Sequence, residues 1–200
     1  MNYEVIIVGG GVSGLSCALT LSSANAKTEA LKNAGYLVID NNNSDLNKAR
    51  LFNVPGIASG AEGAETLGAL RAQLDRYGVC DLMEGTVRSV KGEAGSFHVE
   101  LEGGLSVHAK RVVLATGFHG FELDCEGVEV QENLLSPRPG KVALAHQDNR
   151  LREGLYVAGL LSGVYTMFAC AAGSGVKVAC DILSEISGKP AIIHDVTTRS

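Results

Sequence analysis

The segment from Gly9 to Gly14 constrains the fold more than any other part of the chain. It holds three glycines in the order G-x-G-x-x-G, directly after the β-branched run YEVIIV at residues 3–8. Such a run is typical of a strand buried on both faces of a parallel sheet, and residues 12–24 carry leucines at helical spacing. A glycine-rich turn between strand and helix brings bare backbone and free N–H groups to the phosphates of a dinucleotide. The residues that this pattern assigns to the dinucleotide are Gly9, Gly11, Val12, Ser13 and Gly14.

An acidic residue ends the second predicted strand, which spans residues 36–40. A carboxylate in that place accepts hydrogen bonds from the hydroxyls of the adenosine ribose and repels a 2′-phosphate, so it disfavours NADP. Asp40 lies 26 residues after Gly14, against about 20 in the usual pattern, and the polar stretch 25–34 accounts for the excess. Asp40, with Asn41 beside it, is therefore the predicted ribose ligand, and Asp45 beyond the turn is the alternative.

Length and charge limit the class of protein. Two hundred residues suffice for one domain with a hydrophobic core, but not for two full nucleotide-binding domains. We expect a single domain over 1–190 and a flexible tail over 191–200. The formal net charge of −5 argues against nucleic acid and an anionic membrane surface as partners. No stretch approaches the ~20 apolar residues of a membrane span. The first residues lack the basic region of a signal peptide, so we expect a cytoplasmic protein.

The five cysteines form no CxxC pair and have no metal-like spacing. Cys17 and Cys180 lie in helical patterns among alanine and leucine, which favours small buried apolar residues over redox centres. Cys125 is expected to be the most accessible of the five. The sequence therefore predicts neither a metal site nor a redox disulfide.

The rest of the chain alternates strands and helices, as in an α/β fold. We expect a loop over 51–63, a helix over 65–77, an irregular segment over 118–140, strands over 142–145 and 155–158, and a long helix over 163–186 packed through Phe168 and later apolar residues. Three short strands at 86–91, 96–101 and 105–109 should form an antiparallel excursion, and a buried strand at 111–116 should return to the parallel sheet. These patterns predict a doubly wound parallel sheet with a small antiparallel excursion at about 86–109.

The order of short motifs along the chain resembles the FAD-binding domain of thioredoxin reductase-like flavoproteins, in the pyridine nucleotide-disulfide oxidoreductase family. The motifs are GGGVSG, LFNVPGI with a following helix, TVRSV, VVLATG, GLYVAG and AAGSG. The resemblance covers nearly all of residues 3–188. It implies a Rossmann-like sheet of the FAD-binding, three-layer ββα/βα type and noncovalently bound FAD. It also implies that the fingerprint glycines and Asp40 contact the ADP part and that the backbone at Val87 meets the adenine. Along the pyrophosphate and ribityl side it places Ala115, Thr116 and Gly117.

The chain departs from that family in three respects. The family inserts an NADPH-binding domain with its CxxC disulfide after the ATG strand, whereas here Gly140 follows Gly117 by only 23 residues. The chain therefore lacks the second nucleotide site and the disulfide, which excludes thioredoxin reduction by the family's own route. The Gly-Asp pair that binds the ribityl chain reads Gly159-Leu160. Where the family has an Arg-Gln-Ala that lines the flavin ring, this chain has Thr166-Met167-Phe168. We therefore expect an apolar ring pocket. Met167 and Phe168 either stack on the ring or belong to the core.

Two histidines, His119 and His146, are candidates for either a functional or a surface role. His119 closely follows the ATG motif, where the family's chain passes near the flavin, so it is either a proton donor or a surface loop residue. His146 is expected at the surface.

The leading functional expectation is an FAD-binding flavoprotein oxidoreductase that is reduced by free NAD(P)H or by a separate reductase or electron-transfer protein. The alternative is a noncatalytic FAD- or NAD-binding module, or a subunit of a larger complex. An NAD-dependent dehydrogenase is disfavoured because the second half offers no catalytic Tyr-Lys or His pair. A homodimer is compatible with either reading, and the sequence leaves the substrate open.

Overall fold

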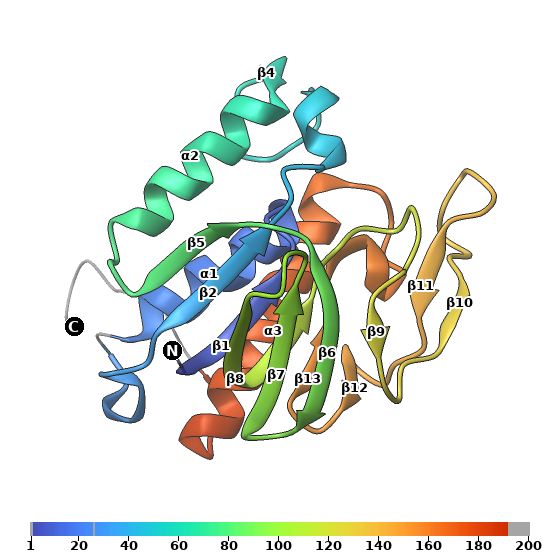
Figure 1. Ribbon diagram of the computed structural model, residues 1–200. Coiled ribbons are helices and arrows are strands. Elements are labelled where there is room, and N and C mark those ends of the chain that lie inside the picture. Colours follow the sequence, from blue (N-terminus) through green and yellow to red (C-terminus); the bar gives the residue numbers. More distant parts are fainter. Residues whose placement is uncertain (1, 26, 192–200) are drawn as a thin grey trace.

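The computed structural model describes residues 2–25 and 27–191, and these form a three-layered α/β structure (Figure 1). The predicted tail at 191–200 lies, apart from Ala191, outside the described residues. The helices are α1 (Val12–Asn25), α2 (Gly63–Asp75) and α3 (Phe168–Ser187), with short 3-10 helices at Glu29–Leu31, Asp45–Lys48 and Gly159–Ser162. The strands are β1 (Asn2–Val8), β2 (Tyr36–Asp40), β3 (Arg50–Leu51), β4 (Ala61–Glu62), β5 (Cys80–Glu84), β6 (Val87–Glu93), β7 (Ser96–Leu101), β8 (Ser106–Leu114), β9 (Asp124–Cys125), β10 (Val130–Glu132), β11 (Val142–Leu144), β12 (Arg150–Arg152) and β13 (Leu155–Val157).

A parallel sheet in the order β5-β2-β1-β8-β13 forms the middle layer. Its central strand β1 is buried on both faces, since Ile7 faces one apolar cluster and Ile6 and Val8 face another. This explains why the strand reads as a β-branched run instead of alternating polar and apolar residues. All five strands point the same way, so their carboxyl ends meet at one edge of the sheet.

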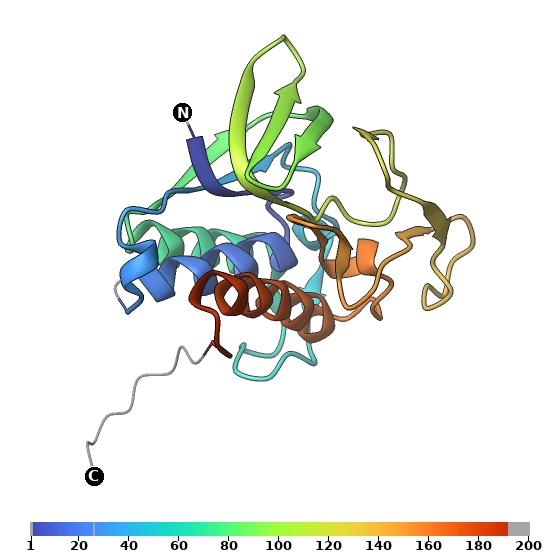
Figure 2. The ribbon, with the colours of Figure 1, turned by 90° about the horizontal axis from the view of Figure 1, so that it is seen from below.

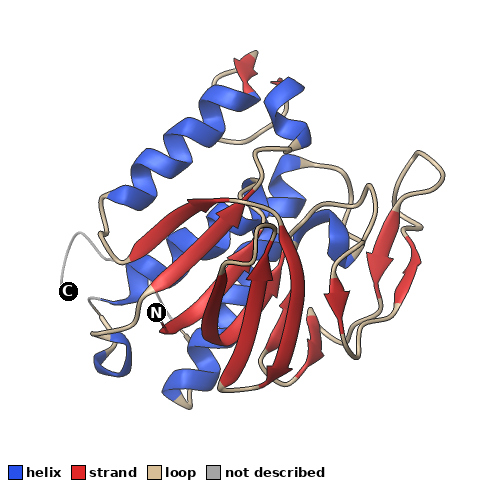
Figure 3. Ribbon diagram, viewed as in Figure 1, coloured by secondary structure: helices blue, strands red, loops and turns tan. Residues whose placement is uncertain are grey.

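The helices cover one face of this sheet and antiparallel strands cover the other (Figures 2 and 3). On the helical face, α1 and α3 pack against each other and α2 packs beside α1. Apolar side chains of these helices, such as Leu15, Leu67 and Val178, pack in the same cluster as Ile7 of β1. On the second face, β6, β7 and the first half of β8 curl over the sheet and bury Phe97 and Val99. The predicted α/β fold with an antiparallel excursion is confirmed, with strands as its third layer.

One long strand takes the place of two predicted ones. Residues 105–109 and 111–116 were expected as separate antiparallel and parallel strands, but β8 runs through both. Its first half pairs with β7 and its second half with β13, while β1 lies along its other edge. The sequence pattern changes at Lys110 because the two halves have different neighbours, although the backbone continues.

Further differences lie where the chain has little periodicity. The edge strand β5 was missed because most of its side chains are exposed and its sequence, CDLME, is polar. The segment expected to be irregular at 118–140 contains β9, which pairs with β6 in the main sheet, and β10, which pairs with β11 in a separate arm beside the main body (Figure 1). The predicted loop at 51–63 includes a two-residue antiparallel ladder between β3 and β4. The last helix begins at Phe168 instead of 163.

None of the helices in the described part of the chain combines the length and the hydropathy needed to cross a membrane.

Candidate functional site

A cleft of about 1050 Å³ opens at the carboxyl ends of the parallel strands. Ligand pockets commonly measure about 300–1000 Å³, so this cleft is large enough for an extended dinucleotide. The loops after β1, β2, β5, β8 and β13 all contribute to its walls, which is the edge at which open α/β sheets bind ligands. All the predicted cofactor residues line it except Gly14 and Gly159. The residues in that lining set are Gly9, Gly11, Val12, Ser13, Asp40, Asn41, Val87, Ala115, Thr116, Gly117, Leu160, Met167 and Phe168.

The three fingerprint glycines have different physical roles. Gly9 has a φ of +111°, and a Cβ there would lie 2.4 Å from the carbonyl oxygen of Ala115. A Cβ at Gly14 would lie 1.9 Å from the carbonyl oxygen of Gly9. A Cβ at Gly11 would meet nothing closer than Ser44 Oγ at 3.4 Å, which is ordinary contact. Gly9 and Gly14 are therefore required by the protein itself, whereas Gly11 leaves space that faces the cleft.

Helix α1 begins at the cleft, directly after the glycine turn. The N–H groups of its first turn have no acceptor within the helix, and Val12 and Ser13 line the cleft. The positive end of the helix dipole thus points to the same space that Gly11 leaves open. Together they form an anion-binding surface suited to a pyrophosphate.

Asp40 is held by two donors from different parts of the chain. Its Oδ1 accepts a hydrogen bond from the backbone N–H of Gly10 at 3.1 Å, and its Oδ2 lies 2.7 Å from Nη2 of Arg71 on α2. A Cβ at Gly10 would lie 2.5 Å from the Asp40 carboxyl carbon. Sequence reasoning missed Gly10 and Arg71. The G-x-G-x-x-G spacing gives Gly10 no role, and Arg71 lies 31 residues beyond its partner.

The alternative ribose residue, Asp45, also lines the cleft but has a different partner. Both of its carboxylate oxygens contact Nε2 of His119, at 2.8 and 2.7 Å. Asp40 is therefore the acidic side chain that the fold brings against the glycine turn, through Gly10.

The ATG segment and Val87 form further walls of the cleft. Ala115 follows β8 and donates its N–H to the carbonyl of Val8 at 2.8 Å, which places Thr116 and Gly117 beside the glycine turn. Val87 opens β6 just after β5 and lines the cleft near the end of β2. The structure thus brings the residues assigned to the pyrophosphate side and to the adenine side into one continuous cavity.

The side chains at the far end of the cleft are apolar and accessible. Met167 is 41% exposed, and it lines the cleft together with Leu160 and Phe168. Phe168 was expected to pack the last helix against the core, but it belongs to neither buried cluster because α3 begins there and the side chain faces the cleft. Gly159 lies behind this wall, and its N–H donates to Ser174 Oγ at 3.1 Å. The predicted apolar character of this end is therefore present in the structure.

His119 belongs to a hydrogen-bonded series that joins three segments around the cleft. Nζ of Lys141 lies 2.7 Å from Nδ1, while Nε2 faces Asp45. Because an ammonium group only donates hydrogen bonds, Nδ1 accepts from Lys141, and Nε2 carries the proton that Asp45 accepts. The ring is exposed and lies edge-on to Phe118. His119 is thus a surface residue, yet one in the cleft and fixed by two charged partners. His146 is exposed, as predicted.

The cysteines show no sign of redox pairing. All five are free, and burial raises the pKa of the Cys17 thiol well above its ordinary value. Burial likewise raises the pKa of Cys125 to about 11 and that of Cys80 to about 12. The exposed cysteine is Cys170 at the start of α3, and the expectation that Cys125 would be the most accessible is wrong. Cys125 lies on β9, where pairing with β6 covers part of it. Among the residues the structure describes, no cluster of three metal-ligating side chains occurs.

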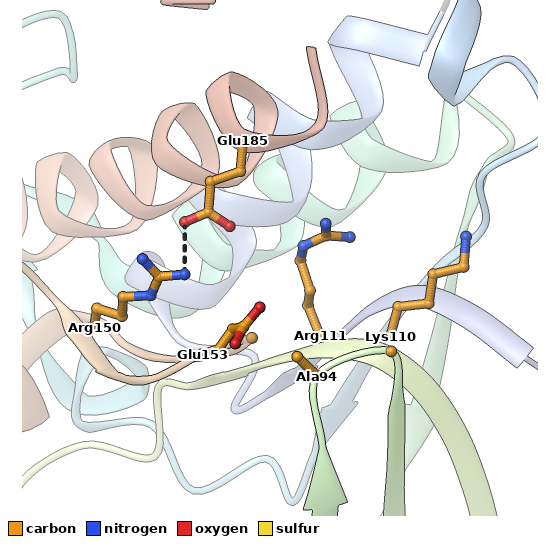
Figure 4. Close-up of a pocket in the computed structure, with 8 residues that line it drawn as sticks. Ala94, Lys110, Arg111, Arg150, Glu153 and Glu185 are labelled. Atoms are coloured by element: carbon orange, nitrogen blue, oxygen red, sulfur yellow. Dashed lines mark ion pairs between the residues drawn. The ribbon is translucent and has the colours of Figure 1, made fainter. Parts of the chain in front are cut away.

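A second, much smaller pocket of about 110 Å³ lies at the opposite, amino-terminal edge of the strands (Figure 4). Arg150 and Glu185 form an ion pair across it at 3.4 Å. The cations Lys110 and Arg111 both bind the carboxylate of Glu4, at 2.8 and 2.5 Å. Its three cations are paired with acids, and its volume is far below that of a nucleotide site.

Comparison with known proteins agrees with this geometry. The sequence profile of the family described as "Pyridine nucleotide-disulphide oxidoreductase" matches residues 3–176. A subunit of the alkyl hydroperoxide reductase in Pseudomonas putida is 26% identical over 99% of this chain and 34% of its own length. Ferredoxin--NADP reductase of Leuconostoc citreum is 26% identical over 96% of this chain and 52% of its own length. Thioredoxin reductase tcpT of Claviceps purpurea is 31% identical over 62% of this chain and 37% of its own. The chain thus spans a third to a half of the length of these relatives.

Solved structures show the same fold. A thioredoxin reductase from Gloeobacter violaceus superposes with a TM-score of 0.75 at 14% identity, over 98% of this chain and 99% of that one. An oxidoreductase from Agrobacterium tumefaciens gives a TM-score of 0.73 at 16% identity, over 93% of this chain and 99% of that one. The profile match over residues 3–176 shows that the chain belongs to the pyridine nucleotide-disulphide oxidoreductase family, whose members bind FAD.

Proposed function

We propose that this chain is an FAD-binding oxidoreductase unit whose flavin is reduced by free NAD(P)H or by a separate electron-transfer protein. The observation that carries the proposal is the cleft at the carboxyl ends of the strands, into which Gly11 and the N-terminus of α1 open. A cofactor supplies the redox chemistry in such proteins, and the chain supplies binding and orientation.

The ADP part fits one end of the cleft. The space beside Gly11 and the N–H groups of Val12 and Ser13 would receive the pyrophosphate. Asp40 keeps acceptor capacity for the ribose, because a carboxylate has about four lone-pair sites and protein donors occupy one on each oxygen. The wall at Val87 would meet the adenine. Asn41 would lie beside the ribose at the same end.

The flavin ring fits the apolar end. Leu160, Met167 and Phe168 line the cleft with apolar side chains that would face a planar ring, and Met167 is 41% exposed. Ala115, Thr116 and Gly117 would lie along the chain that links the two ends. The ribityl hydroxyls would face Leu160 without a carboxylate, which forgoes a charge-assisted hydrogen bond of about 1.5–3 kcal/mol.

The electron donor is external in this proposal. Gly140 follows Gly117 by only 23 residues, and the segment between them contains the short strands β9 and β10. That segment is too short for a second nucleotide-binding domain. We further propose a cytoplasmic location. A homodimer is compatible with this proposal.

A noncatalytic FAD- or NAD-binding module, or a subunit of a larger complex, is the second candidate. The observation in its favour is again Leu160, since its apolar side chain lines the cleft and weakens the hold on a flavin's ribityl chain.

The absorption spectrum of the purified protein tests the cofactor. We expect yellow protein, or uptake of FAD by the colourless protein, with bands in the near-ultraviolet and blue. Colourless protein that takes up NAD but not FAD in calorimetric titration would contradict the proposal.

Stopped-flow mixing of the FAD-loaded protein with NADH and NADPH separates the two candidates. Without a built-in nicotinamide site, reduction should be slow and should not saturate, because free encounter forfeits the advantage of positioning. Dithionite should reduce the flavin readily. Rapid, saturable reduction by either nucleotide would disprove the external donor. A flavin inert to both nucleotides and to electron-transfer proteins would favour the noncatalytic module.

A further inference from the structure

The side chain of Arg71 offsets the negative charge of Asp40, the residue that would bind the adenosine ribose. Its Nη2 lies 2.7 Å from Oδ2 of Asp40 and 3.3 Å from Oδ1 of Asn42. The Asp40 and Arg71 side chains are 15% and 34% exposed, so water screens this ion pair only in part. The pair joins α2 to the end of β2 and closes over the carboxylate that Gly10 holds from the other side.

A carboxylate at this position normally discriminates between dinucleotides by charge. It accepts hydrogen bonds from ribose hydroxyls and repels a 2′-phosphate, whereas an arginine nearby accommodates that phosphate. Here both groups occur together at bonding distance. The guanidinium cancels most of the negative field of Asp40 while leaving each oxygen able to accept one further hydrogen bond.

Five cationic side chains line the cleft, and among the described residues none of them forms an ion pair with Asp40; they are Lys48, Arg50, Arg88, Arg138 and Lys141. Arg50 and Arg88 line the cleft but pair with acids of their own, Glu62 and Glu102. Within residues 2–25 and 27–191, Arg71 is the one cationic side chain within ion-pairing distance of Asp40.

We propose that Arg71 is a specificity-determining residue that makes the cleft tolerant of a 2′-phosphorylated adenosine ribose, so that the cleft accepts the adenosine half of NADP(H) as well as that of FAD. The proposal rests on the placement of the ADP part at Asp40. It revises what the isolated acidic residue predicts from sequence, which is exclusion of NADP.

Calorimetric titration of the FAD-free protein with ADP-ribose and with 2′-phospho-ADP-ribose tests this inference. The two probes differ only in the 2′-phosphate and carry neither nicotinamide nor flavin. The wild type should bind both with dissociation constants within about tenfold of each other. Arg71→Gln should shift their ratio at least about tenfold against the phosphorylated probe, because removing one adjacent charge is worth about 1.4 kcal/mol at this exposure. Arg71→Lys should retain the wild-type ratio.

Two further variants control the experiment. Arg76→Gln removes the same charge from the end of the same helix, where the side chain is exposed, and should leave the ratio unchanged. Asp40→Asn should shift the ratio in the opposite direction, toward the phosphorylated probe. Arg71→Met, which keeps the aliphatic stem and removes the charge, serves as the test if Arg71→Gln proves unstable. A merely structural role for Arg71 would weaken both probes equally and leave their ratio constant.

The outcomes separate the inference from the proposed function. An unchanged ratio in Arg71→Gln or in Arg71→Met, with ADP-ribose still bound, overturns the role of Arg71 alone. Wild-type protein that binds ADP-ribose but rejects the phosphorylated probe more than a hundredfold also overturns it. Wild-type protein that binds neither probe overturns the placement of the ADP part and the inference with it.

Discussion

Replacement of Gly11 by valine should abolish dinucleotide binding without damage to the fold. Gly11 does not require a left-handed backbone, and the nearest atom to an added Cβ is Ser44 Oγ at 3.4 Å. The Cβ of the valine would therefore meet no protein atom at short range, and its side chain would begin in the space that faces the cleft. The pyrophosphate, in contrast, has to approach the backbone to about 2.7–3.2 Å to accept N–H hydrogen bonds. A carbon atom in that space keeps it at about 3.5–4 Å.

The magnitude follows from the hydrogen bonds that this displacement breaks. Each charge-assisted hydrogen bond contributes about 1.5–3 kcal/mol. If the phosphates lose two of them, the loss is about 3–6 kcal/mol, which corresponds to roughly two to four orders of magnitude in the dissociation constant. FAD affinity is measured by calorimetric titration of the cofactor-free variants, and stability by thermal unfolding without cofactor. Gly11→Ala should show a smaller loss of affinity in the same assay.

Gly14→Ala provides the matched control. A Cβ there would lie 1.9 Å from the carbonyl oxygen of Gly9, so the clash is with the protein's own backbone. Overpacking of this kind costs about 1–3 kcal/mol, and a chain of this size should lose about 2–4 °C of melting temperature for each kcal/mol. We thus expect Gly14→Ala to melt several degrees lower and Gly11→Val to melt as the wild type does. FAD affinity preserved in Gly11→Val would refute the placement of the pyrophosphate. A melting temperature lowered as much as in Gly14→Ala would refute the distinction between the two glycines.

Three further predictions concern the apolar end of the cleft, the thiols and alkaline stability. Leu160→Asp should tighten FAD binding at least tenfold by restoring a charged acceptor worth about 1.5–3 kcal/mol, and unchanged affinity in calorimetry would place the ribityl chain elsewhere. Cys170 should react with iodoacetamide at pH 8 at least tenfold faster than Cys125, whose pKa burial raises to about 11. Comparable labelling rates of the two thiols would contradict this difference in reactivity. Replacement of Cys125 by serine should leave any flavin turnover intact. Burial, followed by a hydrogen bond to an aspartate, raises the pKa of Tyr3 to about 12 from 10.0. The contribution of its neutral phenol to folding is therefore complete below pH 10 and is lost between about pH 10 and 12. Chemical denaturation of Tyr3→Phe across that range should show a weaker pH dependence, and identical curves would disprove this coupling.

The parts of the fold that the sequence predicts well are those with local periodicity. The strand at 3–8, the helix that follows and the strand ending at Asp40 each have a pattern readable within ten or fifteen residues, and each is present in the structure. The edge strand β5 has one neighbour and few buried side chains, so it produces no such pattern. The short strands β9 and β10 pair with β6 and β11 through two- and three-residue ladders, which are too short to show any periodicity.

The candidate site divides in the same way. The glycine turn was predicted because a strand, three glycines and a helix follow one another directly in the chain. Met167 and Phe168 could be assigned to the cleft or to the core from sequence, since helical spacing is common to both. Their exposure, which depends on where α3 begins, decided for the cleft.

The sequence by itself determined the Rossmann-like architecture and the position of a dinucleotide cleft at the carboxyl ends of the strands. Both follow from the order of elements and from backbone chemistry within one strand–turn–helix unit. The tertiary structure decided the charges around the cleft. Arg71 reaches Asp40 across 31 residues, and Lys141 and Asp45 meet on either side of His119 across 22 and 74 residues. Such pairs depend on how helices and loops dock on the sheet, and no local pattern records that docking. In our proposal, the choice of ribose therefore depends on the packed molecule, whereas the glycine turn that would receive the pyrophosphate is specified by six consecutive residues.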